Sequence, residues 1–121
     1  MKSHFDAKIY RFIFIKFLSN MLNVESVKTE LRSLRPEIME RFGVSKIGLY
    51  GSITRNDFCD SIDIDIIVSF NRPVGIEFID LAEFLEKKLA HKIDLVSFNA
   101  MNALFYSRIE NEIIYVNPQT T

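Results

Sequence analysis

The segment SIDIDIIVSF, residues 61–70, alternates isoleucine with polar residues before it becomes apolar. Such alternation predicts a β-strand with one buried face, because successive strand side chains point to opposite faces of a sheet. Asp63 and Asp65 then lie on one face, about 7 Å apart along the backbone. Strand interiors disfavour aspartate, so the two acids require a chemical explanation. The opposite face, which we expect to be buried, carries Ile62, Ile64, Ile66 and Val68.

A helix is expected upstream of this strand. Apolar residues recur every three or four positions across residues 24–42, which is helical spacing. Asn23 or Ser26 can cap its start, and Gly43 suits its C-terminal end. Pro36 falls inside the pattern, so it either kinks one helix or starts a second helix at its first position.

The other elements are predicted from the same two patterns, alternation for strands and spacing by three or four residues for helices. The patterns predict strands over 46–50 and 92–98, a turn with one helical turn over 51–57, helices over 76–90 and 101–113, and a last strand or docked tail over 113–116. This order predicts an α+β (α/β) fold, in which a small mixed sheet is flanked by helices.

Composition sets the class of protein. The chain has 121 residues and a formal net charge of -1, which predicts one domain and gives no reason to expect direct nucleic-acid binding. A single cysteine, Cys59, fits a reducing cytoplasm. Charges interrupt the apolar runs of residues 1–20, so we expect an N-terminal extension there and no membrane segment. Residues 21–121 are predicted to form the domain.

The paired aspartates favour a metal. Two carboxylates this close raise each other's pKa unless a cation lies between them, and Mg²⁺ prefers carboxylate oxygens. Asp94 interrupts a third strand, KIDLV. If that strand neighbours residues 61–70, Asp94 joins Asp63 and Asp65 on one face. Three carboxylates can hold two metal ions for phosphoryl or nucleotidyl transfer.

A Gly-Ser turn precedes the acidic strand. Gly51 permits close backbone approach to a ligand, Ser52 supplies a hydroxyl, and Arg55 supplies a cation. Taken alone, such a turn is usually only a turn, and two aspartates on an exposed strand face are usually a solvated edge. The combination of both features with Asp94 favours a site for a nucleotide and a metal.

These motifs resemble a known family. G-S-x-x-R, then D-I-D-I-I-V, then a later strand aspartate is similar to the minimal nucleotidyltransferases of the DNA polymerase beta-like nucleotidyltransferase superfamily, over residues 23–116. The family often has glycine where Asn56 stands and serine where Ile62 stands, with Ser61 one place earlier. The resemblance implies that Gly51 and Ser52 hold nucleotide phosphates, that Arg55 places phosphate or fixes the loop, that Asp63 and Asp65 bind Mg²⁺, and that Asp94 is a third metal ligand and a base.

The resemblance also implies a partner. Such proteins often act as the antitoxin of a HEPN-type ribonuclease toxin, transferring AMP from ATP to a tyrosine of the toxin with two Mg²⁺ ions. Two alternatives stay open: an antitoxin that neutralises its partner by binding alone, and an enzyme that modifies a small molecule such as an aminoglycoside.

We predict that residues 1–20 are dispensable for folding, because the regular periodicity begins near Val24. A protein that begins at Met21 should unfold cooperatively, within a few degrees of the full chain, in a thermal melt followed by circular dichroism. An insoluble or non-cooperative product would place residues 1–20 in the core.

Overall fold

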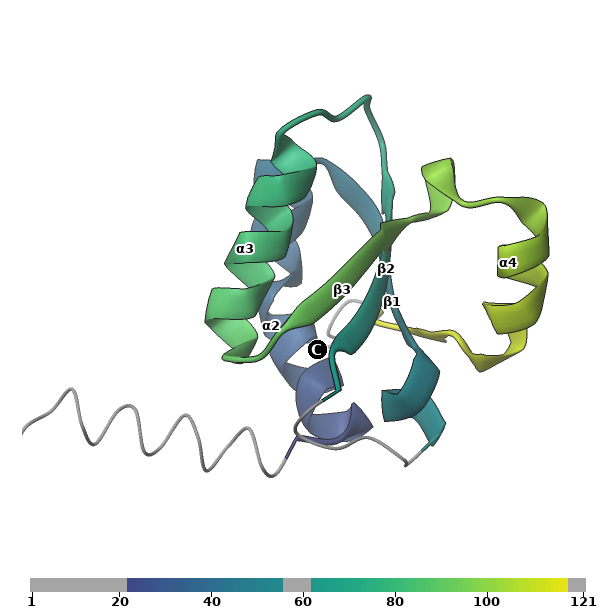
Figure 1. The fold of residues 1–121 in the computed structure, drawn as a ribbon. Helices are drawn as coiled ribbons and strands as arrows, with labels where there is room; N and C mark the ends of the chain where they lie inside the picture. The colour runs from purple at the N-terminus through teal and green to yellow at the C-terminus, as the bar shows by residue number, and fades with distance from the viewer. Residues whose placement is uncertain (1–21, 56–61, 118–121) are drawn as a thin grey trace, which may run out of the picture.

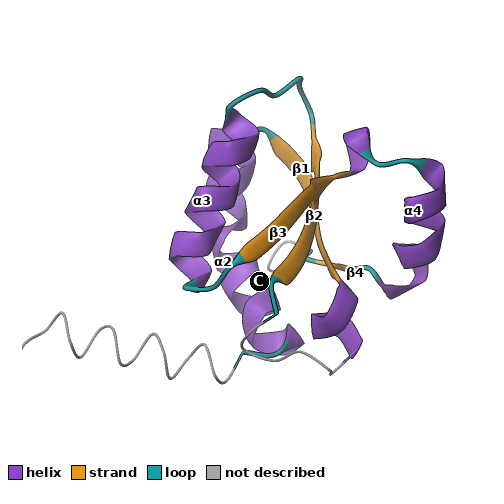
Figure 2. Cartoon of the chain, viewed as in Figure 1, coloured by secondary structure: helices purple, strands orange, loops and turns teal. Residues whose placement is uncertain are grey.

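The computed structural model describes residues 22–55 and 62–117, which form a mixed sheet with helices on both faces (Figure 1). The four strands lie in the order β3-β2-β1-β4. Helices α2 and α3 cover one face, and α4 lies on the other (Figure 2). The elements are α2 (Val24–Phe42), β1 (Val44–Tyr50), η1 (Gly51–Arg55), β2 (Ile64–Phe70), α3 (Glu77–Leu89), β3 (Ile93–Ser97), η2 (Phe98–Ala100), α4 (Ala103–Ile109), η3 (Glu110–Glu112) and β4 (Ile114–Tyr115). The predicted fold class is confirmed.

Helix α2 is closed at both ends. The Asn23 side chain accepts a hydrogen bond from the Ser26 N–H, and the Ser26 hydroxyl accepts one from the Asn23 N–H, each at 2.9 Å. Gly43 ends the helix in the left-handed conformation, at φ 69°, which glycine adopts readily. Pro36 lies inside this one helix, so the alternative of a second helix beginning there is wrong.

The strand register positions the acidic residues. Strands β1 and β2 are antiparallel, and Tyr50 pairs with Asp65. Strands β2 and β3 are parallel, and Asp65 pairs with Asp94. The pairing confirms the prediction that these two strands are neighbours. Helix α3 lies between them in the chain and supplies the crossover that parallel strands need.

The core lies mainly between the sheet and helices α2 and α3. Ile64, Ile66 and Val68 are fully buried there, as predicted. Ile62 is 37% exposed, so its predicted place in the core is wrong. It precedes β2, which begins at Ile64 rather than at residue 61. The opposite face is also partly buried, since Ile67 contributes to a second cluster with Tyr50 and Ile109.

The C-terminal segment completes the sheet. The predicted helix over 101–113 is shorter, because α4 ends at Ile109 and η3 follows. Residues 114–115 then form β4 against β1, which confirms the last strand. Residues 1–20, the predicted domain start at residue 21, Asn56, Cys59 and Ser61 lie outside the described residues. No helix within 22–55 and 62–117 is long and apolar enough to cross a membrane.

We predict that Asn23→Ala destabilises the fold by about 1 kcal/mol, because it removes the acceptor that caps α2. Urea unfolding measures the change. Asn23→Asp is the matched control and should stay within a few tenths of a kcal/mol of wild type, since aspartate is an equally good cap. Equal loss in both variants would mean that capping is not the cause.

Candidate active site

Asp65 and Asp94 form the centre of the acidic site. They are direct neighbours across β2 and β3, with Asp65 half-buried and Asp94 exposed. Burial, followed by the charges of Asp94 and Asp63 and a side-chain hydrogen bond to Asp94, raises the pKa of Asp65 to about 6, which Arg55 partly opposes. In its protonated form Asp65 donates the hydrogen bond to Asp94. The raised pKa shows that nearby positive charge does not offset the two carboxylates.

Asp63 is the outer member of the acidic set. It lies exposed just before β2 rather than within the strand, and its charge still reaches Asp65. Among the described residues, no group of three or more His, Cys, Asp or Glu side chains is arranged to hold a metal ion. Mg²⁺ binding therefore stays a prediction. The hard oxygen donors of the Asp65–Asp94 pair and its excess of negative charge fit such a cation.

The turn after β1 faces these acids. Gly51 has φ 78°, and a Cβ built on it would collide with Oδ2 of Asp65. Glycine is required here both for the left-handed backbone and for the close approach to Asp65. The predicted turn with a helical turn is confirmed as η1, which the Thr54 hydroxyl closes by donating to the Gly51 carbonyl oxygen at 2.7 Å.

Ser52 is a buried polar residue beside this contact. It is 9% exposed, and its Oγ has no hydrogen-bond partner among the described residues. Buried hydroxyls nearly always have a partner. An unsatisfied hydroxyl next to Gly51 and Asp65 suits a ligand that supplies an acceptor, such as a phosphate oxygen.

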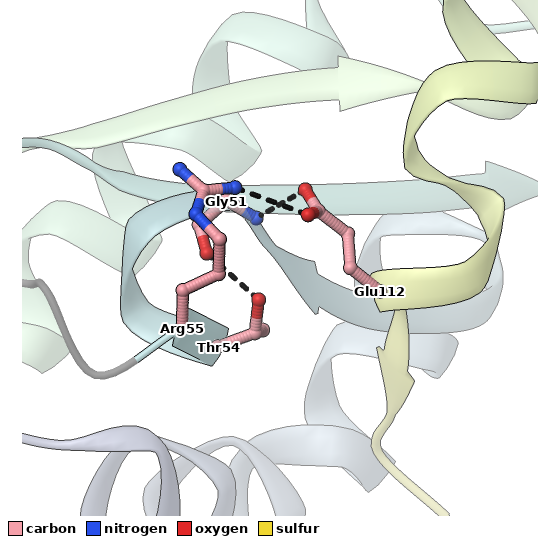
Figure 3. A network of polar contacts seen from close by, with 4 residues as sticks. All are labelled: Gly51, Thr54, Arg55 and Glu112. Carbon is pink, nitrogen blue, oxygen red and sulfur yellow. Dashed lines mark hydrogen bonds and ion pairs between the residues drawn. The ribbon is translucent and has the colours of Figure 1, made fainter.

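Glu112 joins the turn from the far end of the chain (Figure 3). Its Oε1 accepts a hydrogen bond from the Gly51 N–H at 3.0 Å, and its Oε2 accepts one from Arg55 Nη1 at 3.0 Å. Arg55 therefore forms an ion pair within the protein. The sequence offers no signal for this contact, because 57 and 61 positions separate the partners.

Tyr50 is the second residue that the sequence analysis did not assign to the site. It is 6% exposed and faces Asp65 across the antiparallel pair. Burial, then the charges of Asp65, Asp94 and Glu112, raise the pKa of its phenol, which stays protonated at neutral pH. Its place directly before Gly51 in the predicted strand is the only signal that could have identified it.

A separate groove lies away from these residues. It has a volume of about 980 Å³ and is lined by apolar residues that include Phe70, Val74, Phe78, Met101 and Phe105. Phe70 ends β2, whereas Asp65 lies near its beginning. None of the acidic or turn residues described above lines this groove, so the groove is not the acidic site.

The fold is that of solved nucleotidyltransferase-type structures, such as a minimal nucleotidyltransferase with a TM-score of 0.65 and 21% identity over 77% of this chain and 95% of that one. Similar solved structures include a toxin–antitoxin with AMP-PNP, with a TM-score of 0.61 and 19% identity over 73% of each chain. Another is a tri-AMPylated Shewanella oneidensis HEPN toxin in complex with MNT antitoxin, with a TM-score of 0.56 and 18% identity over 76% of this chain and 73% of that one.

The sequence match establishes the family. The model of the nucleotidyltransferase domain matches residues 31–116, and the chain belongs to this family of enzymes. A curated relative, protein adenylyltransferase MntA of Thermococcus cleftensis, is 35% identical over 97 residues, which cover 79% of this chain and 98% of the relative. The resemblance to minimal nucleotidyltransferases is confirmed.

We predict that Asp65→Asn stabilises the metal-free protein above pH 7. Because the pKa of Asp65 is raised from 3.8 to about 6 on folding, the folded state binds this proton more tightly than the unfolded state, and stability falls as pH rises between these values. The gain should be about 1 kcal/mol, since solvent screens a half-exposed group, and it should vanish near pH 4.

Urea unfolding in EDTA at several pH values measures this gain. Glu83→Gln, the same charge change at an exposed position of α3, is the control and should show no such rise with pH. If the difference in unfolding free energy between wild type and Asp65→Asn is the same at every pH, the raised pKa of Asp65 is contradicted.

Proposed function

We propose that this protein is an Mg²⁺-dependent protein adenylyltransferase, which transfers AMP from ATP to a tyrosine hydroxyl of a HEPN-type toxin and thereby acts as its antitoxin. One observation carries the proposal: Asp65, paired with Asp94, contacts a turn in which the buried Ser52 hydroxyl has no hydrogen-bond partner within residues 22–55 and 62–117. The name of the Thermococcus relative supports transfer of an adenylyl group to a protein. The tri-AMPylated toxin of the Shewanella complex supports a HEPN acceptor.

The proposed site divides into metal and phosphate ligands. Asp63, Asp65 and Asp94 would hold two Mg²⁺ ions, while the Ser52 hydroxyl would contact the phosphates of ATP. Gly51, whose N–H already donates to Glu112, would allow the phosphates to approach the turn closely. When bound, Mg²⁺ stabilises the negative charge on the attacking and leaving oxygens. Arg55 already forms an ion pair with Glu112. Its proposed role is therefore to fix the turn, and not to bind phosphate by itself.

The reaction is an in-line displacement at the α-phosphorus. The acceptor oxygen forms a bond to that phosphorus as the bond to the oxygen bridging to the β-phosphate breaks, and pyrophosphate leaves. Asp94 takes the proton of the acceptor hydroxyl, because it is exposed on a strand separate from Asp65. Tyr50 stays protonated beside these charges and so adds no negative charge to the site.

The setting follows from this chemistry. ATP and a ribonuclease toxin meet in the cytoplasm, and the single cysteine fits that compartment. The net charge of -1 favours a protein acceptor over direct contact with nucleic acid.

We predict that AMP transfer depends on the aspartates. The chain is co-expressed with a HEPN-type partner protein, and the intact mass of that partner is measured for wild type, Asp63→Asn, Asp65→Asn, Asp94→Asn and Arg55→Ala. Asp94→Asn should slow transfer by roughly 10²- to 10⁴-fold because the base is lost. The two metal-ligand variants should lose most of the rate, and Arg55→Ala should lose less.

Glu83→Gln is the matched control and should transfer AMP like wild type. Equal adenylation by wild type and Asp63→Asn would contradict the proposed centre. Full neutralisation by a tight complex without added mass in any variant would favour the antitoxin that acts by binding alone. Transfer to an aminoglycoside in place of the protein would identify the small-molecule alternative.

A further inference from the structure

Glu112 links two segments that are far apart in sequence. Its two carboxylate oxygens accept hydrogen bonds from the Gly51 N–H and from Arg55 Nη1, both at 3.0 Å. These donors stand at the first and last residues of η1 (Figure 3). One carboxylate that binds both ends of a five-residue turn restricts the orientation as well as the position of the turn.

The backbone on either side of Glu112 packs against the sheet. Buried Ile109 precedes η3, and β4 follows it, where Ile114 pairs with Leu49 of β1. Ile113 packs closely against Gly48 of β1: a Cβ built on Gly48 would lie 2.8 Å from Cγ2 of Ile113. Glu112 therefore reaches the turn from a backbone that is packed on both sides.

The held turn contacts the acidic centre directly. Gly51 leaves no room for a Cβ beside Asp65, so any rotation of η1 changes the gap between the turn and that carboxylate. Ser52 follows Gly51, and its buried hydroxyl moves with the turn. A displacement of about 1 Å in such a site can reduce the rate a hundredfold.

The sign of the charge adds to this argument. Glu112 places another carboxylate near Tyr50, whose phenol is also affected by the charges of Asp65 and Asp94. More negative charge beside this site opposes the binding of an anionic nucleotide. The ion pair with Arg55 offsets that charge locally. A carboxylate at this position is therefore better explained by its two hydrogen bonds than by direct attraction of ATP.

We propose that Glu112 is a positioning residue for the nucleotide: by binding the Gly51 N–H and Arg55 it holds η1 at the distance from Asp65 at which the Ser52 hydroxyl engages the phosphates. This role rests on the proposed function, because it requires ATP to bind between the turn and the aspartates.

The test measures the affinity for AMP-PNP with Mg²⁺ by calorimetry, together with the thermal midpoint of each variant. In Glu112→Gln the side-chain oxygen can still accept the hydrogen bond from the Gly51 N–H, but Arg55 loses its charged partner. We expect the affinity for AMP-PNP to fall about tenfold. The thermal midpoint should shift by only a few degrees, since partly exposed ion pairs add little stability. Glu110→Gln removes the same charge from an exposed position of the same turn and should bind like wild type.

A double-variant cycle separates positioning from general stabilisation. If Glu112 acts through Arg55, then Glu112→Gln combined with Arg55→Gln should bind AMP-PNP no more weakly than the worse single variant. If the affinity losses of the two single variants are fully additive in the double variant, Glu112 does not act through Arg55. Unchanged affinity in Glu112→Gln would overturn the positioning role, and tighter binding would do so too, by showing that Glu112 competes with phosphate. If wild type itself does not bind AMP-PNP with Mg²⁺, the proposed function fails, and the role of Glu112 fails with it.

Discussion

The site depends on an unfavourable interaction, the close approach of two carboxylates across parallel strands. Asp65 and Asp94 are register partners, and burial together with the charge of Asp94 raises the pKa of Asp65 to about 6. The fold sustains this because Ile64 and Ile66, on either side of Asp65, are fully buried on the opposite face. Burying each such side chain contributes roughly 1.5–3 kcal/mol. Strain of this kind is common where a site is preorganised for a ligand.

The connectivity of the sheet brings the parts of the site to one edge. Strand β1 runs antiparallel to β2, so its last residue, Tyr50, meets Asp65 near the start of β2. The crossover through α3 makes β3 parallel to β2 and places Asp94 at the same level. The turn after β1 and the first residues of β2 and β3 therefore meet at one end of the sheet.

Periodicity was sufficient to predict most of the fold and to place Asp65 and Asp94 on strands that the structure pairs. The period of two in residues 61–70 located Asp65 and its buried opposite face, and the third strand supplied Asp94. Ile62 was misplaced because burial at a strand end depends on what covers it, which alternation does not encode. Glu112 was missed for a different reason: its partners are about sixty positions away, and no local pattern records a contact between a turn and a distant carboxylate.

The outer strands of the sheet have a consequence for self-association. The two residues of strand β4 pair with Gly48 and Leu49 of β1, and the Val116 N–H donates to the Ile47 carbonyl oxygen. A short edge strand offers few unpaired backbone groups to another chain. The other edge, β3, carries the exposed Asp94, and a charge on an edge strand discourages the addition of a further strand. The carboxylate assigned to chemistry thus also opposes edge-to-edge aggregation, so its removal would expose an apolar strand, Ile93–Ser97, to pairing between copies of the protein.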